Sequence, residues 1–256
     1  MATDHVQTIE IPMTGSASAH AYVARPSDPD GDDTEHPGVL FFMDAIGLRP
    51  RIAEMAQRIA DWGYVVLAPN VFHREGRAEE LAPEDDLREP GAREAFFAKA
   101  MPRVQALTPN LAEQDIPIYL AALRGLDGVY EDTVAAVGYC MGARLAVRAA
   151  GLDPEVAAVG GFHGGGLVTE DERSPHRGIP RARAEFLFGH ADHDRSMPPE
   201  SVEELRRVLD EAGLAGTSVV YAGAAHGYTM ADTPMYDESA AERHFIELEE
   251  LLDRTL

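Results

Sequence analysis

The sequence is poor in cysteine, lysine and tryptophan. Among its 256 residues there is one cysteine (Cys140) and one tryptophan (Trp62), and of 22 basic residues only Lys99 is a lysine. A single cysteine excludes an intramolecular disulfide, so nothing calls for an oxidising compartment. Acidic residues number 44, which gives a net charge of −22. So negative a surface repels phosphate backbones and anionic headgroups, which argues against nucleic-acid binding and membrane attachment.

Long hydrophobic runs are also missing. No stretch approaches the roughly 18 apolar residues that a membrane-spanning helix needs. Residues 1–5 are polar and acidic and lack the basic and apolar regions of a signal peptide, so we expect a cytoplasmic protein. No glycine-rich dinucleotide motif follows a predicted strand and no P-loop is present, so nucleotide binding has no support.

What the sequence does contain is the pattern of an α/β protein. Hydrophobic residues make up 45% and charged residues 26%, the composition of a globular protein. Alternating or continuous apolar runs predict strands at 6–11, 19–25, 38–43, 64–68, 133–137, 156–162, 184–188 and 218–221. Amphipathic patterns predict helices at 51–62, 92–101, 111–126, with Asn110 as N-cap, 141–150, 200–212 and 239–252.

This alternation indicates a mostly parallel sheet covered by helices on both faces, with the first two strands as an antiparallel edge. The polar segment 26–37, rich in proline and aspartate, is predicted to be a loop. No linker is long enough to divide the chain, so we expect a single domain over residues 1–256.

The only cysteine lies in a motif that suits a nucleophile. Gly138-Tyr-Cys-Met-Gly142 stands between a predicted strand and a predicted helix, in the G-x-nucleophile-x-G pattern of a nucleophile elbow. The two glycines allow backbone segments to approach closely at the sharp turn. The backbone N–H of Met141 would then lie at a helix N-terminus, where it can stabilise an oxyanion. We therefore predict that Cys140 is a catalytic nucleophile.

A base and an orienting acid should follow the nucleophile in the chain. His226 comes directly after the strand 218–221, at the place expected for the base. For the acid the segment after strand 184–188 offers Asp192 and Asp194, and the distance from Gly189 favours Asp192, with Asp194 as the alternative. The cluster of His190, Asp192, His193 and Asp194 could also be a metal site, although neighbours on one tight loop seldom converge on an ion.

Two further segments belong to the predicted edge of the sheet. Asp44 ends the strand 38–43, and the N–H of Ala45 would be the second oxyanion donor. Asp44 could instead be a helix-capping or turn residue. The sequence His163-Gly-Gly-Gly166 is similar to the oxyanion motif of lipases, but that motif precedes the nucleophile, so we interpret it as a flexible turn near the site.

These segments together resemble the dienelactone hydrolase family of the α/β-hydrolase fold. The similar stretches are 41–48, 62–69, 137–143, 189–192 and 225–228 with the last helix, and the resemblance covers about residues 5–254. The resemblance implies a Cys140-Asp192-His226 triad and a thiol-gating carboxylate at Asp44. The family's prototype has a substrate-binding arginine four residues after the histidine, where this chain has Met230.

The sequence therefore predicts a cysteine hydrolase of small carboxylic esters or lactones that works through a thioester. We expect Met230, Tyr139 and Tyr228 to line the substrate pocket. Without the arginine we expect neutral substrates to be preferred, unless Arg74, Arg77 or Arg195 reaches the pocket. No cofactor and no metal is expected, and the partners would be a small-molecule substrate and, at most, a second copy in a weak homodimer. The alternatives are a non-catalytic binding protein of this fold and an acyltransferase.

Overall fold

The computed structural model describes residues 6–15, 17–27 and 35–256. Its centre is an eight-stranded sheet in the order β1-β2-β4-β3-β5-β6-β7-β8. The strands are β1 (Gln7–Pro12), β2 (Ser18–Ala24), β3 (His36–Phe42), β4 (Val65–Pro69), β5 (Val129–Tyr139), β6 (Val156–Phe162), β7 (Glu185–Ala191) and β8 (Gly216–Tyr221). β1 pairs with β2, and β2 with β4, in antiparallel fashion; all the other neighbours are parallel. The predicted fold class and the antiparallel edge are confirmed.

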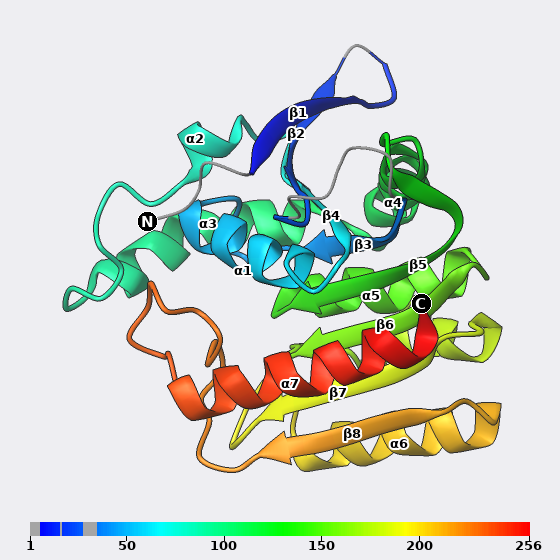
Figure 1. The fold of residues 1–256 in the computed structure, drawn as a ribbon. Helices are drawn as coiled ribbons and strands as arrows, with labels where there is room; N and C mark the ends of the chain where they lie inside the picture. Colours follow the sequence, from blue (N-terminus) through cyan, green and yellow to red (C-terminus); the bar gives the residue numbers. More distant parts are fainter. Residues whose placement is uncertain (1–5, 16, 28–34) are drawn as a thin grey trace.

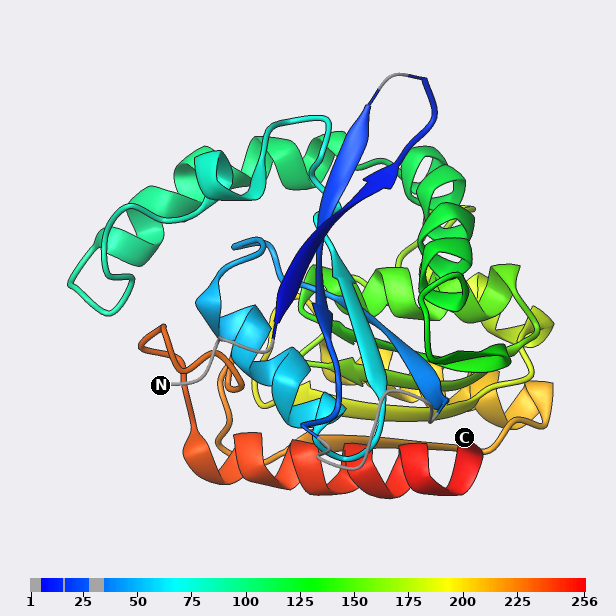
Figure 2. The same cartoon turned by 45° about the horizontal axis from the view of Figure 1, so that its top comes forward.

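Helices cover both faces of this sheet (Figure 1). They are α1 (Pro50–Ala60), α2 (Ala78–Leu81), α3 (Ala92–Ala106), α4 (Pro109–Arg124), α5 (Met141–Leu152), the 3-10 helix η1 (Pro175–Arg181), α6 (Pro199–Ala212) and α7 (Glu238–Thr255). α1 and α7 lie on one face and α4, α5 and α6 on the other, whereas α3 stands outside both layers (Figure 2). No helix in the described ranges is both long and apolar enough to cross a bilayer.

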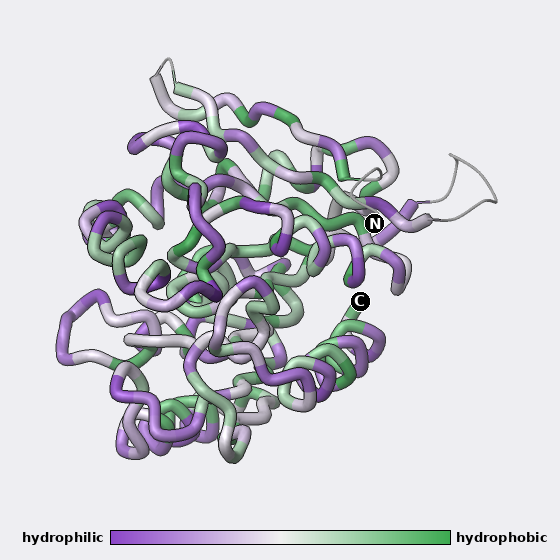
Figure 3. Tube along the Cα trace, turned by 90° about the vertical axis from the view of Figure 1, so that its left-hand side faces the viewer, coloured by the Kyte–Doolittle hydropathy of each residue, from purple (hydrophilic) through white to green (hydrophobic). Residues whose placement is uncertain are grey.

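The core follows from the pattern of hydrophobic residues. The central strands are apolar over nearly their whole length, and β4 is buried at all five positions, because helices shield both faces of a parallel sheet. Figure 3 shows these hydrophobic segments in the middle of the molecule. Each covering helix turns one stripe toward the sheet, such as Ile52, Met55 and Ile59 of α1, which are all buried.

The element boundaries differ from the predictions in several places. Helix α4 is capped by Thr108, whose side chain accepts a hydrogen bond from the N–H of Leu111, and not by Asn110. Pro109 takes the first helical position, where its missing N–H costs nothing. Helix α3 continues through Pro102 to Ala106, and β7 runs three residues further than predicted, to Ala191. Of the predicted loop 26–37, residues 28–34 lie outside the described residues and β3 already begins at His36.

The turn from β5 into α5 depends on two glycines without side chains. A Cβ on Gly138 would lie 2.2 Å from the carbonyl oxygen of Gly142. A Cβ on Gly142 would lie 2.3 Å from the carbonyl oxygen of Phe42, at the end of β3. The close approach predicted for both glycines is therefore confirmed, and it presses the start of α5 against the end of the neighbouring strand.

We expect Gly142→Ala to destabilise the protein by about 3 kcal/mol or more, because the new methyl group overlaps backbone atoms that cannot rotate away. Gly125→Ala is the matched control: its φ of −83° suits any residue, and its Cβ would have a nearest neighbour at 3.2 Å. That control should cost less than about 1 kcal/mol. Urea unfolding of both variants measures the difference, and equal midpoints would contradict the overlap argument.

Candidate active site

The residues predicted to carry the chemistry meet at the carboxyl edge of the sheet. Cys140 follows β5, Asp194 lies in the loop after β7, and His226 lies in the loop after β8. The arrowheads of the parallel strands and the orange loop after β8 lie together at the left of Figure 1. Parallel strands end at the same edge of the sheet, which is why residues 86 positions apart in sequence come into contact.

Cys140 sits at a strained turn. Its backbone has φ 54° and ψ −118°, a conformation that side-chain-bearing residues rarely adopt. The backbone N–H of Cys140 donates to the carbonyl of Phe162 at 3.0 Å, which ties the turn to the end of β6. The side chain is partly exposed and free of disulfide bonding. This is the geometry of a nucleophile elbow that presents its side chain above the sheet edge.

The imidazole of His226 links the thiol to a carboxylate. Its Nε2 lies 3.1 Å from Sγ of Cys140, and its Nδ1 lies 2.6 Å from Oδ2 of Asp194. Asp194 is further held by Ser196, which donates from both its backbone N–H and its hydroxyl to Oδ1. Thiol, imidazole and carboxylate thus stand in the order that acyl-transfer enzymes use for nucleophile, base and acid.

The structure places Asp194, the alternative acid, against His226, and not the preferred Asp192. The Oδ2 atom of Asp192 accepts from the backbone N–H of Gly223 at 2.9 Å, so Asp192 joins the ends of β7 and β8. The prediction counted from a strand that ended at position 188, whereas β7 continues to Ala191 and moves the turn along the chain. His193, with φ 51°, then turns the backbone between the two carboxylates.

The electrostatics of the site favour a charged pair. Burial by itself would lower the pKa of His226, but the charge of Cys140 and the hydrogen bond to Asp194 raise that pKa to about 10. Burial would raise the pKa of Asp194, yet the hydrogen bonds from His226 and Ser196 lower it to about 2. The raised pKa of His226 and the lowered pKa of Asp194 together favour an imidazolium hydrogen-bonded to a carboxylate.

Two backbone N–H groups are available beside the thiol. Within the described part of the chain, neither the N–H of Met141 nor that of Ala45 has a hydrogen-bond acceptor. Met141 is the first residue of α5, where the helix dipole favours negative charge, and Ala45 lines the pocket that contains Cys140. Both are the donors expected from the sequence, and their free N–H groups suit an oxyanion.

Asp44 is engaged by a buried arginine. Its two carboxylate oxygens accept from Arg49 at 2.7 and 3.0 Å, and Oδ1 also accepts from the backbone N–H of Ile46. Arg49 pairs in addition with Asp232, and although burial lowers its pKa, Asp44 and Asp232 together raise it. Among the described residues no hydrogen bond joins Asp44 to Cys140, so the thiol-gating role implied for Asp44 stays a prediction. The bond from the N–H of Ile46 to Oδ1 is that of a turn residue, which was the alternative.

The pocket beside Cys140 differs from the expected one. Met230 lines it, as predicted, but Tyr139 and Tyr228 do not. Both tyrosines are fully buried: the hydroxyl of Tyr139 bonds to His244, and that of Tyr228 donates to the carbonyl of Gly189. Tyr139 ends β5 and stacks on Phe41 and Phe162, and the ring of Tyr228 lies against that of Tyr221, so both belong to the core.

Residues without a motif complete the pocket. Arg93 and Phe97 reach it from α3, and their side chains stack with 4.7 Å between the guanidinium and the ring centre. Arg93 has no carboxylate partner among the described residues, whereas the candidates Arg74, Arg77 and Arg195 do not line the pocket. Sequence reasoning missed Arg93 because α3 has no clear amphipathic period that would show which face meets the site. The structure thus supplies a cation where the sequence indicated none.

His163 also belongs to the site. Its ring lies against that of His226 with centroids 5.4 Å apart, and its Nε2 is 2.8 Å from the hydroxyl oxygen of Thr229. Burial, and then the charge of His226, lowers the pKa of His163, so it remains neutral beside the imidazolium. The turn predicted at 163–166 is therefore part of the wall that supports the base.

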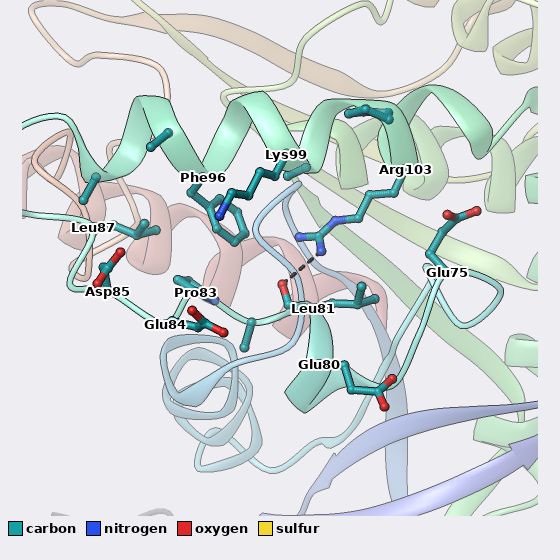
Figure 4. A pocket seen from close by; sticks show the side chains of 15 residues that line it. Glu75, Glu80, Leu81, Pro83, Glu84, Asp85, Leu87, Phe96, Lys99 and Arg103 are labelled. Carbon is teal, nitrogen blue, oxygen red and sulfur yellow. Dashed lines mark hydrogen bonds between the residues drawn. The ribbon is translucent and has the colours of Figure 1, made fainter.

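Arg103 fixes the loop that contains Ala45. From α3 it donates to the carbonyls of Ala45 and Ile46, and its other terminal nitrogen donates to the carbonyl of Leu81. The bond to Leu81 is dashed in Figure 4, which shows a separate cavity of about 360 Å³ between α3 and the segment 75–87. Cys140 does not line that cavity. Arg103 therefore ties α3 to the loop whose Ala45 N–H faces the pocket of Cys140 as the expected second oxyanion donor.

The cluster 190–194 does not converge as a metal site would. His190 bonds to Ser218, Asp192 to Gly223 and Asp194 to His226, while the side chain of His193 is almost fully exposed. Among the described residues no group of three such side chains is arranged around a common point.

We expect Asp194→Asn to lower kcat/KM for ester hydrolysis on the order of 10²-fold or more, since the amide can no longer hold the imidazolium. Asp192→Asn is the matched control, because it lies two residues away and faces the backbone N–H of Gly223 and the exposed side chain of His193, not His226. That control should stay within a few-fold of the wild type. Initial rates on an ester that both variants hydrolyse give the comparison, and the reverse ranking would return the role to Asp192.

Comparison with known proteins agrees with this geometry. The chain is 28% identical over 235 residues to a protein of Escherichia coli strain K12 provisionally named carboxymethylenebutenolidase. The matched region covers 91% of this chain and 80% of that protein. It is 26% identical over 227 residues to the carboxymethylenebutenolidase of Pseudomonas sp. strain P51, over 85% and 84% of the two chains. A Klebsiella pneumoniae structure provisionally described as a dienelactone hydrolase superposes with a TM-score of 0.80 at 22% identity, over 97% and 98% of the chains. The model of the dienelactone hydrolase family matches residues 19–256, and the chain belongs to that family.

Proposed function

We propose that this hydrolase cleaves small carboxylic esters or lactones with Cys140 as nucleophile, His226 as acid and base, and Asp194 as the orienting acid. The observation that carries the proposal is the continuous chain of contacts from Sγ of Cys140 through the imidazole to the Asp194 carboxylate, at 3.1 and 2.6 Å. A binding-only protein would have no need of a strained cysteine held beside a protonated imidazole and two unengaged N–H groups.

In the acylation step the thiolate of Cys140 attacks the carbonyl carbon and a C–S bond forms. The carbonyl oxygen becomes an oxyanion, which the N–H groups of Met141 and Ala45 stabilise. The C–O bond to the leaving group then breaks as His226 donates its Nε2 proton to the departing alkoxide. The products are a thioester on Cys140 and an alcohol, which in a lactone remains attached to the acyl chain.

Acylation also prepares the base for the second step. The main influence that raises the pKa of His226 is the negative charge of Cys140, and a thioester is neutral. Once that charge is lost, the pKa of His226 falls and the imidazole accepts a proton from water. The hydroxide attacks the thioester, the C–S bond breaks, and the thiolate leaves with the imidazolium restored beside it. Asp194 keeps the imidazole orientation through both steps.

The shape of the pocket limits the substrate. The space beside Cys140 is only about 20 Å³, and Phe97, Met230 and Met235 are among the side chains that close it. Most small-molecule sites offer a few hundred Å³. A substrate must therefore be small or must displace flexible side chains such as the methionines. We accordingly place the substrate class at compact esters and lactones.

We expect wild-type protein to hydrolyse p-nitrophenyl acetate and small lactones, and Cys140→Ala to reduce turnover to the uncatalysed background, because Cys140 is the chain's single cysteine and its Sγ is the atom that His226 Nε2 contacts. Mass spectrometry of Cys140→Ser or of wild type quenched during turnover should find the acyl group on residue 140. Met141→Leu, which keeps the backbone N–H, serves as a control and should keep most of the activity. Residual activity in Cys140→Ala would exclude the proposed nucleophile, and an inactive wild type would favour the binding-only alternative.

We expect Arg93 to make carboxylate-bearing substrates acceptable, since a guanidinium with no acidic partner can form charge-assisted hydrogen bonds to an anion. The test compares a lactone carrying a carboxylate with its methyl ester. Arg93→Gln should lower kcat/KM for the acid by about tenfold, equal to about 1.4 kcal/mol, and leave the ester within about twofold. An equal loss with both substrates would mean that Arg93 only supports α3.

A further inference from the structure

Arginines gather in a second cavity, away from Cys140. This cavity of about 230 Å³ lies between α4, α5 and η1, and none of its lining residues lines the pocket of Cys140. Arg148 of α5, Arg173, and Arg177 and Arg181 of η1 all face it. In a chain with 44 acidic and 22 basic residues, four arginines around one small cavity are unexpected. We call this group the arginine cavity.

The arginines of this cavity have more hydrogen-bond donors than their partners use. Arg148 and Arg173 share one carboxylate, that of Glu113. Arg177 and Arg181 donate only through Nε, to the carbonyls of Asp171 and Gly151. The terminal nitrogens of both therefore have no acceptor among the described residues. Glu172 also lines the cavity but pairs with none of the four.

The charges of the cavity are not balanced. Four guanidinium groups face two carboxylates, Glu113 and Glu172, so the lining has an excess of two positive charges. Burial lowers the pKa of Arg148, and the positive charges of Arg144 and Arg173 lower it further against the effect of Glu113. Positive charges that lie so near one another repel, which raises the electrostatic free energy of the folded protein. An anion placed between these guanidinium groups would offset that repulsion.

We propose that the arginine cavity binds a phosphate group, either as inorganic phosphate or as a phosphate monoester. A phosphate dianion matches the excess of two positive charges, and its oxygens accept paired N–H bonds from planar guanidinium groups. Leu152 and Pro175 form an apolar part of the lining, where the carbon portion of a monoester would rest. The proposal is independent of the reaction at Cys140.

Titration calorimetry at constant ionic strength tests the proposal with sodium phosphate and phenyl phosphate as probes. We expect saturable binding of one equivalent with Kd below about 1 mM, and at least tenfold weaker binding in Arg177→Gln and Arg181→Gln. The matched control is Arg183→Gln, an exposed arginine two residues beyond the cavity lining, which should bind as the wild type does. Tighter binding of phenyl phosphate would identify a monoester as the occupant, and equal affinities would identify inorganic phosphate.

A variant with the opposite expected sign separates binding from mere structural support. Glu113→Gln removes the carboxylate that competes for Arg148 and Arg173, so phosphate should bind several-fold more tightly even though two ion pairs are lost. Protein alkylated at Cys140 with iodoacetamide should bind phosphate unchanged. The proposal is overturned if no saturable binding occurs up to about 10 mM, if Arg183→Gln weakens binding as much as Arg181→Gln, or if alkylation abolishes binding.

Discussion

The site depends on the contact between the backbone of Gly142 and the carbonyl groups at the end of β3. That contact brings the start of α5 against the end of β3 and the segment after it, which contains Ala45. One packing contact therefore fixes the positions of Cys140 and of the backbone N–H groups of Met141 and Ala45. A Cβ at position 142 would overlap the carbonyl oxygens of Phe42 and Met43, so a side chain there would force these segments apart. The strain at Cys140, with φ 54°, is sustained because the surrounding β3, β5 and β6 strands leave the turn no other path.

Buried charge organises the loops around that contact. Arg49 joins Asp44, at the end of β3, to Asp232, in the loop after His226, and Arg103 holds the carbonyls of Ala45 and Ile46 from α3. Removing one partner of such a buried pair typically costs about 3–5 kcal/mol, because the remaining charge has no solvent. Strong local charge pairs therefore persist inside a protein whose surface is highly acidic.

The two halves of the site were predictable to different degrees. Cys140 and His226 could be named from the sequence because a glycine-flanked turn and the position after a strand are local features. The carboxylate that contacts His226 could not, since the choice between Asp192 and Asp194 depends on where β7 ends, and that strand continues to Ala191. The prediction that Tyr139 and Tyr228 line the pocket was wrong for a similar reason: an aromatic residue next to a motif can pack in the core as well as contact a substrate.

The sequence by itself determined the α/β architecture, the antiparallel edge and the nucleophile elbow, because periodicity, glycine spacing and strand–helix alternation act over short distances. Only the tertiary structure decided that Arg93 reaches the pocket, that Arg49 forms an ion pair with Asp44, and that four arginines surround one cavity. Each of these depends on contacts between elements that lie far apart in the chain. Long arginine side chains can extend toward many neighbours, and the packing of helices such as α3, α5 and η1 selects which neighbour is within reach.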